Sequence, residues 1–203
     1  MDTVTKQLSH IKYIPMIKAV DLQHVRSLGS ALITGGLPAA NVSQQTNDGL
    51  EVLRILASEF PNLLVGGGNV QTVGEARNAI EAGAKFIFSP LFDPAIIELC
   101  QMQGVAIYPV TIDGILAVEQ ELKVLGFYPV EKLGGLPVID HLSDLFGLKF
   151  IVAGGITEKT VTTYVANRHV LAATGSWMID PTLVASGRWD LLTLNIQRTA
   201  SLV

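Results

Sequence analysis

Short runs of apolar and β-branched residues alternate with helix-length segments along the whole chain. The runs are apolar at nearly every position, which is typical of strands buried on both faces of a parallel sheet. We therefore predict eight strands, at Ile14–Ala19, Ala39–Gln44, Leu63–Gly67, Phe86–Ser89, Ala106–Val110, Leu125–Pro129, Phe150–Ala153 and Val170–Thr174. Each intervening segment is long enough to hold a helix, so the pattern indicates successive βα units.

Capping residues stand where the intervening helices are expected to begin. Thr72 and Glu75 have the spacing of a capping box. Asp93 and Asp180 each precede a proline that suits the first turn of a helix, and Asp21 is expected to cap the first helix. Glycines that can end helices in the left-handed conformation are Gly83, Gly104 and Gly147.

Eight βα units in 203 residues match the lower size limit of a (β/α)8 barrel. A doubly wound open sheet is the alternative that the same alternation allows. The sequence contains no linker, low-complexity stretch or break in composition. We therefore predict an α/β protein in which residues 1–203 form a single (β/α)8 TIM barrel domain.

Composition excludes several classes of protein. Hydrophobic residues make up 49% of the chain and charged residues 16%, against a usual charged share of about 25%, so a large buried core is expected. A formal charge of −4 argues against nucleic-acid binding. No apolar run reaches the roughly 18 residues of a membrane span, and residues 1–12 lack the apolar core of a signal peptide. A cytoplasmic protein without nucleic-acid or membrane partners is expected.

The sequence offers few metal ligands. Cys100 is the only cysteine, so neither a disulfide framework nor a cysteine-based metal cluster is expected. The four histidines are scattered, and none lies at the carboxyl end of a predicted strand. We expect no metal and no cofactor.

In a barrel of this kind, binding residues lie at the carboxyl ends of the strands and in the loops that follow. Gly154 and Gly155 stand between the seventh strand and a helix that Thr157 is expected to cap, and Gly175 and Ser176 end the eighth strand similarly. Backbone N–H groups in such turns can bind an anion. Glycines also permit tight turns without any ligand, but two such turns at the last two strands favour a phosphate site.

Eight short motifs occur in order along the chain: Ile14-Pro-Met-Ile17, Gly35-Gly36, Val65-Gly-Gly-Gly-Asn-Val70, Glu81-Ala-Gly-Ala84, Phe88-Ser-Pro90, Tyr128-Pro-Val-Glu131, Gly154-Gly-Ile156 and Gly175-Ser-Trp177. Together they resemble the 2-keto-3-deoxy-6-phosphogluconate / 4-hydroxy-2-oxoglutarate (KDPG/KHG) aldolase family over nearly the whole chain. The resemblance implies a homotrimeric barrel of the class I pyruvate-aldolase type, a lyase that cleaves a 2-keto acid to pyruvate and an aldehyde. In that chemistry a lysine forms a Schiff base and a glutamate moves protons.

The catalytic positions of that family hold other residues here. By the resemblance, the lysine of the sixth strand falls on Gly126, the glutamate of the second strand on Asn41, and the arginine that binds the substrate carboxylate on Gln45. Two threonine positions fall on Asn69 and Ala153. The functional positions that match the family are the phosphate-binding ones, Gly154, Gly155, Gly175 and Ser176. The resemblance therefore predicts that ordinary Schiff-base activity is absent.

One further departure lies on the fifth strand. The residue after Pro109 is a glycine in the family and is Val110 here.

Two lysines are candidate substitutes for the missing amine. Lys18 interrupts the first apolar strand, where a charge is costly unless it faces a ligand cavity or a partner. Anion binding is its expected role, and a relocated Schiff base is the alternative. Lys132 follows the sixth strand in a loop at the same end of the barrel. Lys123 is rejected, because its odd offset from Gly126 would place it on the opposite face of a strand.

Three functions stay open. The first is a lyase that acts on a 2-keto acid with a relocated amine. The second is a non-catalytic barrel, a pseudoenzyme, that binds phosphate or a sugar phosphate. The third is another phosphate-dependent barrel enzyme, which would use Asp113 or Glu131 as its acid or base, although Asp113 is also placed to cap a helix.

Overall fold

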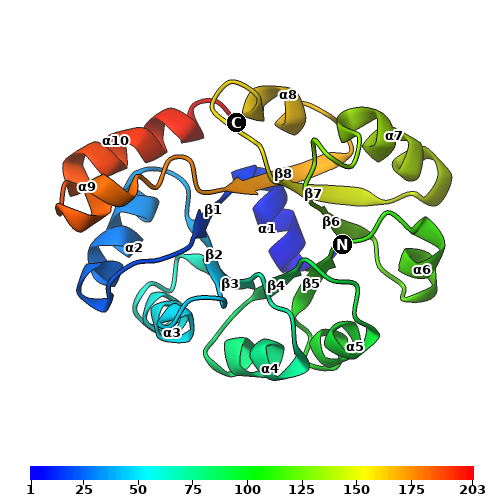
Figure 1. Cartoon of the computed structure of the whole chain (residues 1–203), viewed down its shortest axis with the longest axis horizontal. Coiled ribbons are helices and arrows are strands. Elements are labelled where there is room, and N and C mark those ends of the chain that lie inside the picture. Colours follow the sequence, from blue (N-terminus) through cyan, green and yellow to red (C-terminus); the bar gives the residue numbers. More distant parts are fainter.

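Eight parallel strands form a barrel surrounded by helices (Figure 1) in the computed structural model, which describes residues 1–203. The strands are β1 (Tyr13–Ile17), β2 (Ala39–Ser43), β3 (Leu64–Gly68), β4 (Phe86–Ser89), β5 (Ala106–Pro109), β6 (Val124–Phe127), β7 (Lys149–Ala153) and β8 (Val170–Gly175). Their order around the sheet is β5-β4-β3-β2-β1-β8-β7-β6. All eight predicted strands are present, and their ends differ from the predicted ones by at most two residues.

Helices follow the strands in the order that the alternation predicts. They are α2 (Val25–Thr34), α3 (Gly49–Glu59), α4 (Val73–Glu81), α5 (Pro94–Met102), α6 (Gly114–Glu119), α7 (Gly135–Phe146), α8 (Val161–Val165), α9 (Pro181–Ala185) and α10 (Trp189–Ala200), with a 3-10 turn η1 (Leu22–His24) before α2. None of these helices is long and apolar enough to cross a membrane.

The barrel closes where β5 meets β6. These two strands are joined by one parallel bridge, between Val110 and Gly126, just beyond the end of β5. The bridge connects the two ends of the sheet order, so the alternative of an open doubly wound sheet is excluded. The predicted (β/α)8 barrel is confirmed.

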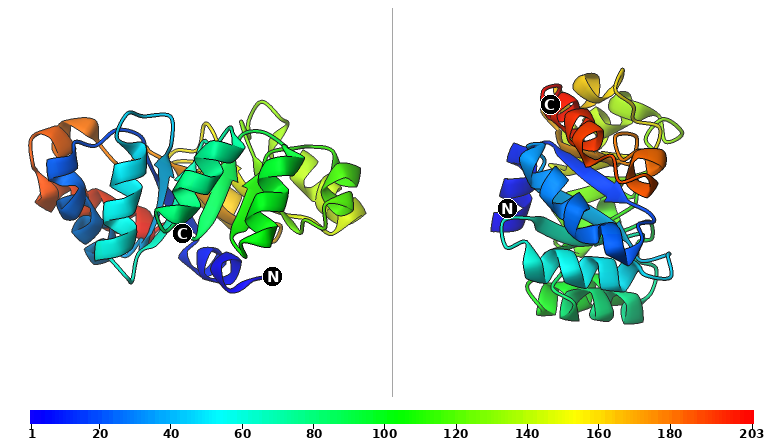
Figure 2. Two further views of the ribbon diagram at one scale, coloured as in Figure 1. Left: turned by 90° about the horizontal axis from the view of Figure 1, so that it is seen from below. Right: turned by 90° about the vertical axis from the view of Figure 1, so that its left-hand side faces the viewer.

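A short N-terminal helix, α1 (Thr3–Ile11), covers the end of the barrel at which the strands begin (Figure 2). Its Leu8 is fully buried among the interior side chains of the barrel. The hydroxyl groups of Thr5 and Tyr108 lie 2.8 Å apart in a buried hydrogen bond. Because α1 occupies this end, a ligand reaches the barrel from the opposite end, where the strands finish. The sequence analysis did not predict this helix.

Most of the predicted helix boundaries are confirmed. Thr72 and Glu75 form a capping box. Asp93 accepts the Ala95 N–H at 2.8 Å, and Asp180 accepts the Thr182 N–H at 2.7 Å. The glycines predicted to end helices all have positive φ angles: Gly83, Gly104 and Gly147.

The prediction for Asp21 is wrong. Its side chain makes no capping hydrogen bond, because the 3-10 turn η1 comes between Asp21 and α2.

The two aspartates give a matched test of capping. Asp93→Ala removes a formed N-cap and is expected to lower the free energy of unfolding by about 1 kcal/mol. Asp21→Ala removes an exposed carboxylate without a capping bond, so a change within about 0.5 kcal/mol is expected. Urea denaturation followed by circular dichroism measures both, and equal losses would contradict this assignment of the caps.

Candidate functional site

A cavity of about 350 Å³ opens at the carboxyl ends of the strands, opposite α1. It brings together seven of the sequence-predicted positions with apolar and aromatic side chains. The residues that line it are Met16, Lys18, Asn69, Phe88, Pro90, Tyr128, Ala153, Gly154, Gly155, Ile156, Thr174, Gly175, Ser176 and Trp177. Four other predicted positions, Asn41, Gln45, Gly126 and Lys132, do not line it.

Two consecutive glycines shape one side of the cavity. Gly154 and Gly155 both have φ of +85°, a conformation that L side chains rarely adopt. A Cβ atom on Gly154 would also lie 2.8 Å from the Tyr128 ring. The N–H groups of Gly154, Gly155 and Ile156 donate no hydrogen bond within the protein. This turn therefore offers backbone N–H groups that can donate hydrogen bonds to an anion.

The next strand ends beside this turn. β8 finishes at Gly175, and Ser176 adds a hydroxyl and a backbone N–H that has no acceptor in the chain. A side chain at Gly175 would meet the Tyr13 hydroxyl, because a Cβ atom would lie 2.6 Å from it. That hydroxyl is buried without a hydrogen-bond partner, and its burial raises the pKa of Tyr13.

The predicted role of Thr157 as a helix cap is wrong. A turn at residues 158–160 follows it, and α8 begins only at Val161, whose N–H donates to the Thr157 carbonyl at 2.9 Å. The helix is only five residues long. An anion at this turn therefore interacts with free N–H groups of the loop and not with the amino end of a capped helix.

Lys18 lies just beyond β1 rather than within it, because the strand ends at Ile17. The side chain is exposed, so the expectation of a lysine inside an apolar strand is corrected. Lys18 lines the cavity and also borders two neighbouring hollows of about 430 and 440 Å³. Among the cavity-lining residues it is the only one with a charged side chain.

Gly126 is buried beneath the cavity, and the space beside it is filled. A Cβ atom at this position would lie 2.8 Å from Cζ of Phe88 and 3.0 Å from Cγ2 of Val110. Contacts this short force a neighbour to move. The structure therefore leaves no room for a longer side chain to begin at position 126.

Asn41 lies on β2, and its side chain is completely buried. Its Nδ2 lies 3.4 Å from the Thr174 hydroxyl, which itself donates to the Ile14 carbonyl at 2.8 Å. Its Oδ1 is buried without any partner. The neighbouring β3 strand accommodates Asn41 only because Gly68 has no side chain there.

Gln45 is directed away from the cavity. Its Nε2 donates to the Asn69 carbonyl at 3.0 Å and to Glu75 Oε1 at 3.1 Å. Asn69 has φ of +54°, which Asn tolerates better than most residues, and its Nδ2 donates to the Ser43 hydroxyl at 3.3 Å. The position of the family's carboxylate-binding arginine is thus used here to hold the loop after β3.

The two candidate acids or bases lie outside the cavity lining. Asp113 accepts the N–H groups of Ile115 and Leu116 and so caps α6. Glu131 accepts a hydrogen bond of 2.5 Å from the Tyr164 hydroxyl. Burial and the contact with Glu131 raise the pKa of Tyr164 to about 12, which keeps the phenol protonated at neutral pH. Neither carboxylate lines the cavity, although a Cβ atom on Gly155 would lie 3.2 Å from Cγ of Glu131.

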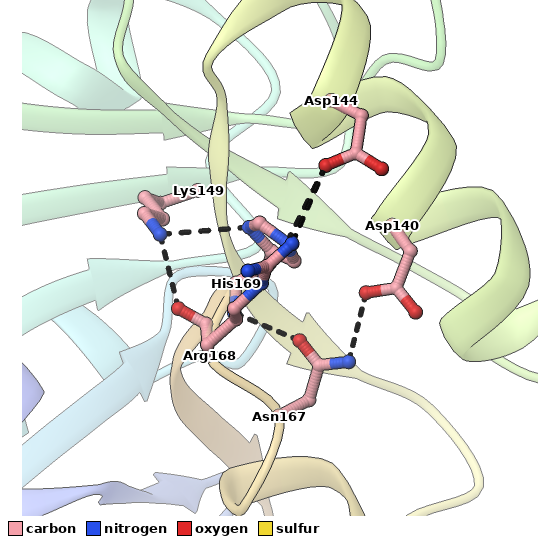
Figure 3. Close-up of polar contacts among 6 residues, drawn as sticks. All are labelled: Asp140, Asp144, Lys149, Asn167, Arg168 and His169. Atoms are coloured by element: carbon pink, nitrogen blue, oxygen red, sulfur yellow. Dashed lines mark hydrogen bonds and ion pairs between the residues drawn. The ribbon is translucent and has the colours of Figure 1, made fainter.

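A second polar cluster lies at the other end of the barrel (Figure 3). Lys149, at the start of β7, donates to the Arg168 carbonyl at 3.0 Å, and Arg168 Nε lies 2.9 Å from His169 Nε2. Asn167 donates to Asp140 at 2.9 Å and accepts the His169 N–H at 2.8 Å. These contacts tie the loop before β8 to α7 and β7. No group of three or more His, Cys, Asp or Glu side chains is placed to hold a metal ion.

Comparison with known proteins finds similarity over nearly the whole chain. A family model described as KDPG and KHG aldolase matches residues 4–194. The 2-dehydro-3-deoxy-phosphogluconate aldolase of Treponema pallidum is 32% identical over 207 residues, which cover 100% of this chain and 99% of that protein. The KHG/KDPG aldolase of Escherichia coli is 27% identical over 184 residues, covering 89% of this chain and 86% of that protein.

Solved structures agree with the sequence comparisons. A KDPG aldolase from Legionella pneumophila, with pyruvate captured as a covalent carbinolamine intermediate, is 26% identical with a TM-score of 0.88, covering 95% of this chain and 96% of that one. The 2-keto-3-deoxy-6-phosphogluconate aldolase of Zymomonas mobilis with 3-phosphoglycerate is 26% identical with a TM-score of 0.87, covering 98% and 96%.

The packing around Gly126 is open to a direct test. Gly126→Ala is expected to lower the free energy of unfolding by about 1–3 kcal/mol, because the added methyl group overpacks the contact with Phe88 and Val110. Gly74→Ala in α4 is the control: its nearest neighbour would be 3.9 Å away, and a helix gains about 0.5–1 kcal/mol from this change. A stabilised Gly126→Ala variant in urea denaturation would contradict the filled site.

Proposed function

Because this chain belongs to the KDPG and KHG aldolase family, we propose that it binds a phosphorylated small molecule at the carboxyl end of its barrel without cleaving 2-keto acids through a Schiff base. The observation that carries the proposal is Gly126, at the position that the resemblance gives to the lysine. Phe88 and Val110 pack where a side chain at this position would begin.

Schiff-base cleavage needs three chemical functions, and each position expected to supply one holds an unsuitable group. An amine must condense with the keto carbon so that the iminium withdraws electrons as the C–C bond breaks. Gly126 supplies no amine. A carboxylate must then move protons, and the carboxamide of Asn41 is not a base at neutral pH. A cation must hold the substrate carboxylate, but Gln45 is neutral and bonded to Asn69 and Glu75.

The turns at the ends of β7 and β8 support the binding of a phosphate group. Gly154, Gly155 and Ser176 present N–H groups without acceptors in the protein, at the two strands whose loops commonly bind phosphate in barrels of this kind. Lys18 adds the only charge among the residues that line the cavity, and that charge is positive. These donors suit the phosphate group of a sugar phosphate or of a phosphorylated keto acid.

A lyase with a relocated amine is the second candidate function, and Lys18 is the observation that favours it. It is the only lysine that lines the cavity. Its side chain is exposed, whereas a Schiff-base lysine is activated by desolvation or by a second cation. Lys132 is also exposed and does not line the cavity. Non-covalent binding is therefore the better supported function.

Trapping with borohydride separates the two functions. After incubation with pyruvate and borohydride, the intact mass of the wild-type protein is expected to stay unchanged, because no suitable amine meets the keto group. The same protein is expected to release no pyruvate from 2-keto-3-deoxy-6-phosphogluconate. The Escherichia coli relative serves as the positive control for both assays.

A mass increase of the wild-type protein would refute the non-covalent function. Lys18→Met and Lys132→Met would then identify the amine, since only the variant that lacks it would fail to label.

The proposal extends to a cytoplasmic homotrimer, the assembly that the resemblance implies. It is supported by aliphatic side chains exposed on and beside α6, which are Ile112, Ile115, Leu116 and Val118. Exposed apolar groups that lie together are typical of protein interfaces. The single thiol, Cys100, is buried and needs no oxidising compartment.

The assembly is tested by light scattering after size exclusion. The wild-type protein is expected to elute with the mass of three chains of 21.7 kDa. Ile115→Asp is expected to shift it towards the monomer, because a charge would be buried in the interface. Leu194→Asp, which alters an equally exposed aliphatic residue on α10, is expected to remain trimeric. A monomeric wild-type protein would contradict the proposed assembly.

A further inference from the structure

The cavity is electrostatically one-sided. Lys18 and Ser176 line the cavity together with Gly154 and Gly155, whose N–H groups are free, and they also line a neighbouring hollow that Asp180 borders. This side of the cavity carries one full positive charge and several backbone donors. The remaining walls hold no second cation, because every other lining residue is neutral.

Away from the glycine turns, the cavity offers oxygen atoms that can accept hydrogen bonds. Asn69 lines the cavity, and its Oδ1 accepts no hydrogen bond within the protein. Thr174 also lines it, with its proton already donated to the Ile14 carbonyl. Behind Thr174 lies Asn41, whose buried Oδ1 has no partner. The oxygens of Asn69 and Thr174, which line the cavity, can accept a hydrogen bond from a ligand hydroxyl group and repel a second oxyanion.

The Glu75 carboxylate also lies near Asn69, outside the residues that line the cavity. Gln45 bridges the Asn69 carbonyl and Glu75, and Glu75 uses its other oxygen to cap α4. A ligand carboxylate directed towards Asn69 would therefore meet no cation there and would face the field of Glu75.

We propose, building on the proposed phosphate site, that the cavity selects phosphate monoesters whose other end is uncharged, such as polyol or sugar phosphates, over those that end in a carboxylate. The phosphate lies against the Gly154 and Ser176 turns with Lys18 nearby. The hydroxyl groups of the neutral end donate to Asn69. A volume of about 350 Å³ is at the small end of ligand sites, which suits a short ester.

Two commercially common esters form a matched pair for the test. Glycerol 3-phosphate and 3-phosphoglycerate share the phosphate and the carbon chain and differ only at the far end, which is a hydroxymethyl group in one and a carboxylate in the other. Isothermal titration calorimetry with the full chain is expected to give a dissociation constant at least tenfold lower for glycerol 3-phosphate. The Zymomonas mobilis relative, whose structure contains 3-phosphoglycerate, is titrated alongside.

Two variants show which end of the ligand is responsible. Lys18→Met is expected to weaken both esters by a similar factor, since it acts on the shared phosphate, while Lys132→Met changes neither. Asn69→Asp is nearly isosteric and tolerated at a positive φ, and it adds a negative charge beside the far end. This variant is expected to increase the preference for glycerol 3-phosphate further.

Different outcomes test the charge selectivity and the phosphate site separately. Equal or tighter binding of 3-phosphoglycerate would overturn the charge selectivity but leave the phosphate site standing. If neither ester nor inorganic phosphate binds, the phosphate site itself is overturned, and the proposed function with it.

Discussion

The contact between β5 and β6 determines which side chains fit at the carboxyl end of this barrel. The sheet closes there through a single bridge, between Val110 and Gly126, and the Phe88 ring packs against the same point. By the family resemblance, the position of Val110 carries a glycine and that of Gly126 a lysine. In this chain the larger of the two side chains therefore lies on the β5 side, at Val110, whereas by the resemblance it lies on β6 in the family. The barrel stays closed and well packed, and the space through which a lysine would enter the cavity is occupied.

The turns at Gly154 and Gly155 and at Gly175 and Ser176 do not depend on the residues at positions 110 and 126, because their shape is determined by the backbone. Gly154 and Gly155 adopt positive φ angles, and the Tyr128 ring lies where a side chain on Gly154 would begin. Their donors are N–H groups, which no substitution at Asn41 or Gly126 removes. The proposed anion site at one end of the cavity is therefore independent of the residues at the positions that the resemblance gives to the lysine and the glutamate.

The fold and the cap sites were largely predictable, because hydrophobic periodicity and capping chemistry are local. The strand positions were within two residues, and Asp93 and Asp180 cap the helices that were expected. The misses depend on tertiary contacts. Helix α1 has a capping residue, Asp2, but it lies outside the βα alternation, and its place is determined by Leu8, which packs into the interior of the barrel. The sequence could place Gln45 at a functional position, but the direction of its side chain depends on Glu75, which lies on α4.

The neutral residues at the catalytic positions are physically consistent with one another. A buried carboxylate at Asn41 would need a cation, and Gly126, the position that the resemblance gives to the lysine, has no room for one. A cation at Gln45 would meet Glu75 and be drawn away from the cavity. Restoring any one charge alone would therefore leave it unpaired or misdirected. Reactivity of the Schiff-base kind would require Phe88 or Val110 to become smaller while at least two charges returned together, which supports the proposed binding of a ligand without Schiff-base cleavage.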